Sequence, residues 1–210
     1  KRYVISQTEA LVPAVEAFVQ AIKDKDVEAA KAQFPTSRVY WERIEPVAES
    51  FGDLDPRVDL READLEEGQE WTGFHALEKQ LWVTGLQPDA DALGDQLIAD
   101  VKELNDKVKA EDYRIDSLQI AGGAQGLLDE IALSKISGEE DIFSHTDLWD
   151  FNANLQGSQT AVASVRPILD EKDPELGARV DEQFQNVEDL LLQYRDGDGF
   201  VLYDTVTEEQ

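Results

Sequence analysis

A regular apolar stripe runs through DALGDQLIADVKELNDKV, residues 91–108. Its apolar positions recur every three or four residues, the period of a helix with one buried face. They are Leu93, Leu97, Val101, Leu104 and Val108. Similar patterns predict helices over 4–22, 37–51, 74–84, 115–136, 144–169 and 173–194. Because no segment reads as a convincing strand, we expect an all-α fold, an up-and-down helical bundle with short connections.

Prolines, glycines and capping residues set the expected boundaries of these helices. Pro35 should stop a short helix that begins at Asp26, and Pro46 should kink the next one. Residues 52–70 read as a long acidic loop, and 195–210 as an irregular closing segment. Ser144 and Asp147 form a capping-box pattern, and Gly122-Gly123 should interrupt the helix that contains them.

The composition excludes several classes of partner and site. The 210 residues carry a net charge of -27, which argues against binding to nucleic acid or anionic lipid and favours cations. With 41% hydrophobic residues the chain should fold around a core. There is no cysteine, so disulfides and thiolate metal sites are impossible, and no apolar run is long enough to span a membrane.

Two short segments share an unusual pattern of an aromatic residue, a polar residue, any residue, an aliphatic residue and Glu. They are Trp41-Glu42-Arg43-Ile44-Glu45 and Phe74-His75-Ala76-Leu77-Glu78. The polar positions, i and i+3, lie on one face of a helix. This face also carries apolar side chains, and a carboxylate set among them is costly unless something compensates its charge. A bound cation would do so.

Helical bundles hold metal ions through Glu from facing helices and through Glu/His pairs at i and i+3. One imidazole among carboxylates suits iron, zinc, copper or manganese. Two ordinary readings compete with a metal site. His75 could be a core histidine bonded to a neighbouring acid, and Arg38, Glu42, Glu45 and Glu49 could form a solvated ion-pair stripe.

Hydrolytic metal signatures are missing. The only other histidine is His145, and neither H-E-x-x-H nor H-x-x-E-H occurs. The sequence also lacks a G-x-S-x-G nucleophile motif and a P-loop. Serine, thiol and nucleotide chemistry therefore have no support in the sequence.

Longer motifs resemble the EfeO/imelysin-like family over nearly the whole chain. They are Y-W-E-R-I-E-P-V-A-E (40–49), F-G-D-L-D (51–55), W-T-G-F-H-A-L-E (71–78), K-I-S-G-E-E-D (135–141), S-H-T-D-L-W-D-F (144–151) and Y-R-D-G-D-G-F (194–200). Motifs of this length are far more specific than H-x-x-E alone.

The resemblance implies a domain of two packed four-helix bundles that spans residues 1–210 and continues with one more helix. It implies an exported protein, periplasmic or otherwise extracytoplasmic and possibly lipid-anchored, in a ferrous-iron uptake system. Its partners would be a membrane iron permease and a haem peroxidase-like protein. Many family members also carry an N-terminal cupredoxin domain, which this sequence does not include.

The same resemblance implies a set of metal ligands. His75 and Glu78 match the H-x-x-E motif, and Glu42 and Glu45 match the acidic pair of the W-E-R-I-E-P segment. Further candidates are Asp95, from the D-x-L-x-x-D-V pattern, and the pair Glu139 and Glu140, from G-E-E-D, of which Glu139 is preferred. The expected cargo is iron, as Fe²⁺ or Fe³⁺, for which zinc or copper could substitute.

The sequence favours a non-enzymatic iron-binding protein and leaves three alternatives open. One is a zinc-dependent metallopeptidase, because the family was once grouped with peptidases through H-x-x-E. Another is an acidic-polysaccharide binder that uses bridging cations. The third is a scaffold of the uptake complex that binds no metal.

Overall fold

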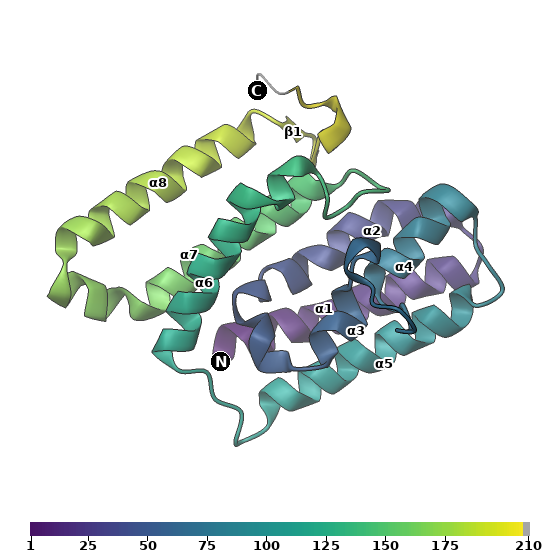
Figure 1. Cartoon of the computed structure of the whole chain (residues 1–210), viewed down its shortest axis with the longest axis horizontal. Coiled ribbons are helices and arrows are strands. Elements are labelled where there is room, and N and C mark those ends of the chain that lie inside the picture. The colour runs from purple at the N-terminus through teal and green to yellow at the C-terminus, as the bar shows by residue number, and fades with distance from the viewer. Residues whose placement is uncertain (208–210) are drawn as a thin grey trace.

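The computed structural model describes residues 1–207, and within that range the protein is an all-α bundle, as the sequence predicts (Figure 1). The α-helices are α1 (Arg2–Lys23), α2 (Val27–Glu42), α3 (Leu54–Asp59), α4 (Phe74–Lys79), α5 (Ala90–Lys109), α6 (Ser117–Leu133), α7 (Asp147–Lys172) and α8 (Pro174–Leu192). Short 3-10 helices cover Glu45–Phe51, Glu62–Asp64, Lys135–Ser137 and Tyr203–Thr205, and a π-helical turn, Gln80–Thr84, extends α4.

The helices form two packed groups (Figure 1). In the first, α1 packs against α2 and α5, and α4 completes the larger hydrophobic core. In the second, α7 packs between α6 and α8 over a smaller core that includes Leu148, Leu155, Leu191 and Phe200. The two groups meet where α2 and the 3-10 helix Glu45–Phe51 contact α7, and this junction contains the candidate site.

The closing segment contains a two-residue hairpin, in which β1 (Arg195–Asp196) pairs antiparallel with β2 (Gly199–Phe200). The rest of the segment up to Thr207 is irregular apart from the turn at Tyr203–Thr205, as expected, and residues 208–210 lie outside the described range. No helix within residues 1–207 is both long and apolar enough to cross a membrane.

The prediction that Pro35 stops a helix is wrong. Helix α2 continues through Pro35 to Glu42, because residues on both sides of the proline are buried on one face. Burial of Phe34 and Trp41 therefore outweighs the cost of a proline within a helix. At Pro46, by contrast, the chain does change, and the 3-10 helix Glu45–Phe51 replaces the kinked α-helix expected there.

Two further local predictions are corrected. The segment 52–70 is not a continuous loop, since it contains α3 and the 3-10 turn Glu62–Asp64. Ser144 and Asp147 do not form a capping box either, because α7 begins at Asp147 and its N-cap residue is Thr146. The Ser144 hydroxyl donates instead to Glu78, 2.7 Å away on α4.

Two glycines allow close packing at the junction of the two groups. Helix α6 runs uninterrupted through Gly122-Gly123, and a Cβ added at Gly123 would lie 1.8 Å from the carbonyl oxygen of Pro46. On α7, a Cβ at Gly157 would lie 2.4 Å from the carbonyl oxygen of Arg43. Both helices thus approach the backbone of the turn that follows Glu42, where a side chain would not fit.

We predict that Gly123→Ala destabilises the protein, while Gly122→Ala does not. The added methyl group at Gly123 must push α6 away from Pro46, at a cost of about 1–3 kcal/mol or more. At Gly122 nothing lies within 4 Å, so alanine should gain roughly 0.5–1 kcal/mol through its higher helix propensity. Urea unfolding of both variants measures the difference, and equal stabilities would contradict the packing described.

Candidate metal centre

Arg38 is the centre of a buried group of ion pairs. Its side chain on α2 is fully buried. The guanidinium lies 2.5 Å from Glu42, 3.2 Å from Asp150, and 3.5 Å from both Glu140 and Asp141, and it also pairs with Asp59. These carboxylates come from α2, α3, α7 and the connection before α7, so one cation holds together segments that are distant in sequence.

His75 on α4 is held at one ring nitrogen. Its Nδ1 lies 2.9 Å from Glu78 Oε2, the i,i+3 contact that the sequence predicts. The other oxygen, Glu78 Oε1, accepts hydrogen bonds from the backbone N–H groups of Phe143 (3.2 Å) and Ser144 (2.8 Å) and from the Ser144 hydroxyl (2.7 Å). Glu78 therefore fixes the orientation of the ring and leaves Nε2 to face the opposite side.

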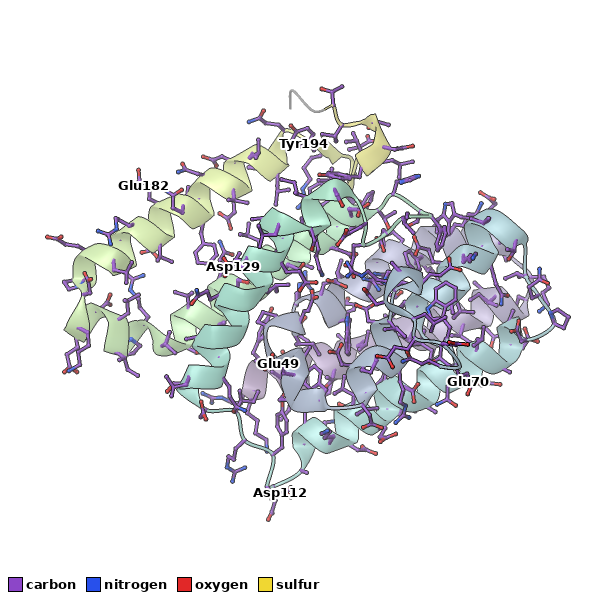
Figure 2. All side chains as sticks on the ribbon, viewed as in Figure 1. Glu49, Glu70, Asp112, Asp129, Glu182 and Tyr194 are labelled. Carbon is purple, nitrogen blue, oxygen red and sulfur yellow. The ribbon has the colours of Figure 1, made fainter. Side chains whose placement is uncertain are left out.

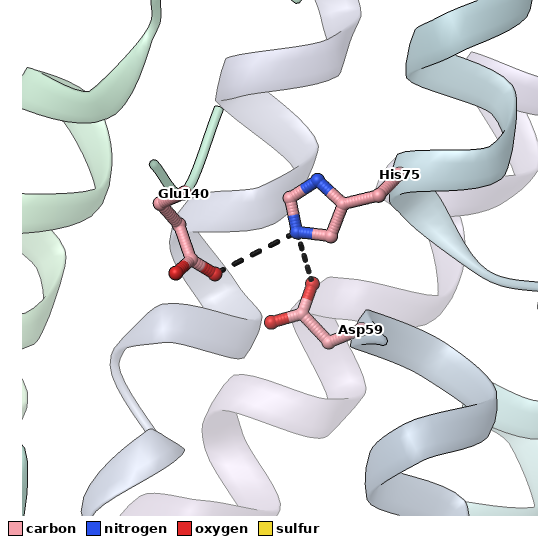
Figure 3. Close-up of side chains that lie close together, drawn as sticks. All are labelled: Asp59, His75 and Glu140. Carbon is pink, nitrogen blue, oxygen red and sulfur yellow. Dashed lines mark ion pairs between the residues drawn. The ribbon is translucent and has the colours of Figure 1, made fainter. Parts of the chain in front are cut away.

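The Nε2 atom of His75 points between two carboxylates (Figure 3). Asp59 Oδ1 lies 3.4 Å away and Glu140 Oε1 lies 3.6 Å away. Nε2 is buried and makes no hydrogen bond within the described residues. Asp59, His75 and Glu140 thus offer three ligand atoms close enough to share one metal ion, and His75, Glu78 and Asp141 form a second such group.

Lys135 supplies another buried cation. It lies on the 3-10 turn after α6, and its ammonium group is 2.7 Å from Glu45, 3.4 Å from Glu140 and 3.7 Å from Glu42. Asn154 on α7 donates to both Glu42 (2.9 Å) and Glu45 (2.7 Å). The acidic pair of the first motif is therefore bound by Arg38, Lys135 and Asn154.

Burial and neighbouring charges shift the pKa values of His75, Glu140 and Asp141. Burial and Arg38 disfavour a charged His75, but the nearby carboxylate of Glu140, the hydrogen bond to Glu78 and the charge of Asp59 outweigh them and raise the pKa of His75 to about 10. Burial opposes the charge of Glu140 as well, yet Lys135, His75 and Arg38 hold its pKa well below the usual value. For Asp141, burial, offset in part by Arg38 and reinforced by Glu78, raises the pKa to about 8.

A surface pocket of about 160 Å³ leads to this cluster. Asp59 and Glu140 lie in its wall, together with Glu45 and Arg61. The remaining lining residues are Asp55, Pro56, Leu60, Asp64 and Glu130. Because most of these side chains are carboxylates, the pocket attracts cations and repels anions. Two of the three residues that meet at Nε2, Asp59 and Glu140, therefore border a pocket that opens to solvent.

The outer surface is strongly acidic too. Figure 2 shows exposed acidic side chains on separate elements, among them Glu49, Glu70, Asp112, Asp129 and Glu182. These residues do not form part of the His75 cluster and serve as a solvated surface.

The structure brings four of the six sequence-predicted ligands together or beside one another. His75 and Glu78 are in contact. Glu42 pairs with Arg38, and Glu45 pairs with Lys135, which also contacts Glu140 beside His75. Asp95 does not face this cluster: its side chain is 62% exposed and pairs with Lys23 on α1. Glu139 is 39% exposed and pairs with Arg61 at 3.0 Å, at the edge of the pocket.

Sequence reasoning missed Asp59 and Asp150 as members of the cluster. It included Glu140 as a candidate together with Glu139, and it gave Asp141, in the same motif, no role as a ligand. Asp59 lies in the segment interpreted as a loop, so no helical face indicated where it points. The ion-pair reading of Arg38 and Glu42 is correct about the pairing but wrong about solvation, since both side chains are fully buried.

Comparison with known proteins places the chain in a family. The family model described as Imelysin, Peptidase_M75, matches residues 1–209. Proteins named iron uptake system component EfeO, from Escherichia coli O157:H7, Escherichia coli K12 and Shigella flexneri, are each 46% identical to it over 211 aligned residues. The alignment covers 99% of this chain and 56% of each relative, so the chain spans about half their length. The chain belongs to the imelysin family.

Proposed function

We propose that this domain binds iron as cargo in a bacterial iron-uptake system. The observation that carries the proposal is His75 Nε2, which is buried, makes no hydrogen bond to any group in residues 1–207 and points between the carboxylates of Asp59 and Glu140. An imidazole nitrogen and carboxylate oxygens are ligands that suit iron. The 46% identity to proteins named as iron uptake components supports the choice of iron among the metals that such ligands accept.

In this proposal His75 Nε2, Asp59 and Glu140 hold the ion. Glu78 orients the imidazole from its other side, and Glu42 and Glu45 remain in their ion pairs with Arg38 and Lys135. Asp141 and Asp150 are further partners of Arg38, 3.5 and 3.2 Å from its guanidinium. The H-x-x-E motif thus supplies one ligand and the residue that positions it.

The charge of the cluster supports a cation as its ligand. Among residues 1–207, seven carboxyl groups pair with only three buried basic groups, Arg38, His75 and Lys135. Carboxyl groups crowded together in a buried site are costly to ionise, and a bound metal ion favours their charged form. The acidic pocket provides a path on which the local field raises the rate of capture.

The same proposal includes the compartment in which the domain acts and the proteins with which it works. We place the domain outside the cytoplasm, where it would capture iron and transfer it to a membrane permease, with a haem peroxidase-like protein as a further component. The names of the relatives, components of an iron uptake system, support a role alongside other proteins of such a system.

We predict that His75→Ala removes iron binding. The change deletes the only nitrogen ligand and leaves Asp59 and Glu140 to hold the ion alone, so affinity for Fe²⁺ should fall at least about 100-fold. Anaerobic titration calorimetry measures this loss.

His145→Asn and Asp95→Asn are the matched controls for that titration. His145 has a positive φ of 59°, a conformation that asparagine tolerates, and the exposed Asp95 lies outside the cluster. Both variants should bind Fe²⁺ with wild-type affinity. Unchanged binding in His75→Ala would refute the assigned site.

We predict that metal binding releases protons. Because the pKa of His75 is raised to about 10, Nε2 carries a proton at pH 7 that the metal must displace. A rise in pH removes this competitor, so affinity should increase by up to about tenfold per pH unit below pH 10. Calorimetry in two buffers of different ionisation enthalpy should show release of about one proton per ion at pH 7. An affinity that is independent of pH would contradict the role of Nε2.

We predict that the domain does not cleave peptides, although its family is named after a peptidase. The oxygens of Glu78, the residue that a peptidase would use as general base, are both engaged, one by His75 and one by the 143–144 backbone. Incubation of the Zn²⁺-loaded chain with casein should give no products beyond those of Glu78→Gln. Zn²⁺-dependent cleavage that Glu78→Gln abolishes would establish a metallopeptidase.

A further inference from the structure

Lys135 lies among three buried carboxyl groups whose negative charge would otherwise need a second bound cation to balance it. Its side chain is 1% exposed, and the carboxylates of Glu45, Glu140 and Glu42 surround its ammonium group at 2.7, 3.4 and 3.7 Å. Lysine is almost never fully buried unless it is paired. The surrounding acids keep it charged: burial lowers its pKa, but Glu45, Glu140 and Glu42 outweigh burial and raise the pKa well above the usual value.

Glu140 links Lys135 to the proposed metal site. Its Oε1 lies 3.6 Å from His75 Nε2, whereas its Oε2 lies 3.4 Å from Lys135 and 3.5 Å from Arg61. The two oxygens of one carboxylate therefore face different partners. A positive charge on the Oε2 side lowers the negative potential that a metal ion experiences at Oε1.

Lys135 also holds two carboxylates that could otherwise bind metal. Glu45 lines the same pocket as Glu140, so its carboxylate is within the region that a cation can enter. With Lys135 in place, Glu45 Oε1 is bound to the ammonium group and Glu45 Oε2 to Asn154. Glu42 is likewise bound by Arg38, Lys135 and Asn154.

We propose that Lys135 is an internal counter-cation that limits the affinity of the site for iron and keeps Glu42 and Glu45 out of the coordination shell. This inference rests on the proposed function and adds a means of release. A site with one imidazole and many free carboxylates would retain a highly charged ion, and a protein that passes iron on must release it. Lys135 is thus a positioning residue, which acts on the metal through Glu140.

The test compares Lys135→Met, Lys135→Gln, Lys135→Arg and Lys102→Gln with the wild type. Lys135→Met removes the charge and replaces the unbranched side chain by one that is a single atom shorter, while Lys135→Arg keeps the charge. Lys102→Gln removes a lysine charge at the surface, where Lys102 pairs with Glu16 and is half exposed. Anaerobic titration with Fe²⁺ gives affinity and stoichiometry, and stopped-flow transfer to a chelator gives the rate of release.

Lys135→Met should bind Fe²⁺ about tenfold more tightly or better and release it correspondingly more slowly, because a positive charge next to Glu140 is gone. Lys135→Arg and Lys102→Gln should behave like the wild type. A structural role alone would not give tighter binding that the arginine variant reverses. Unchanged or weaker binding by a folded Lys135→Met would overturn the inference.

Lys135→Gln covers the case in which Lys135→Met does not fold, since its amide still donates to Glu45. It should also bind more tightly than the wild type, and wild-type or weaker affinity would again overturn the role of Lys135. Failure of the proposed function looks different: in that case wild type and His75→Ala bind Fe²⁺ equally poorly. If the wild type binds and His75→Ala does not, only the Lys135 comparison decides the inference.

Discussion

The ion pairs of the buried Arg38 guanidinium are the interaction on which the site depends. They join α2 to α3, to α7 and to the connection that carries Glu140 and Asp141. Replacing Arg38 by a neutral residue would take a positive charge away from five buried carboxyl groups and break the ion pair of Asp150, at a cost of about 3–5 kcal/mol for a broken buried pair. The same guanidinium thus keeps the carboxyl groups gathered near His75, so that the ion pairs of the folded protein and the proposed metal site share one set of residues.

Much of the helical fold follows from local sequence. The stripes of residues 4–22 and 91–108 correspond to α1 and α5, since apolar residues at helical spacing bury one face in any bundle. Boundaries were harder to predict, because they depend on distant contacts. Pro35 remains within α2 through burial of Phe34 and Trp41. At Gly123, the backbone of Pro46 occupies the space that a side chain would need, so this position of α6 has to be a glycine.

The site was predictable only where its residues are close in sequence. His75 and Glu78 are three residues apart on one helix, so their contact follows from helical geometry. Asp59 and Glu140 reach His75 from other segments, and no spacing rule relates them to it. Asp95 matched a sequence pattern but lies elsewhere in the fold. It belongs to α5, which packs against α1, and its side chain pairs with Lys23 and not with the cluster.

The hydrogen bonds of Glu78 carry a consequence for how sequence variation in this family is interpreted. This carboxylate links the ring of His75 to the backbone of residues 143–144, just after Glu140 and Asp141. Its replacement would disturb both the orientation of the His75 ring and the anchor of the segment that bears Glu140. Constraint on this position would therefore be as strong as on a proposed ligand, and would reflect coupling between two parts of the chain instead of a bond to a metal ion.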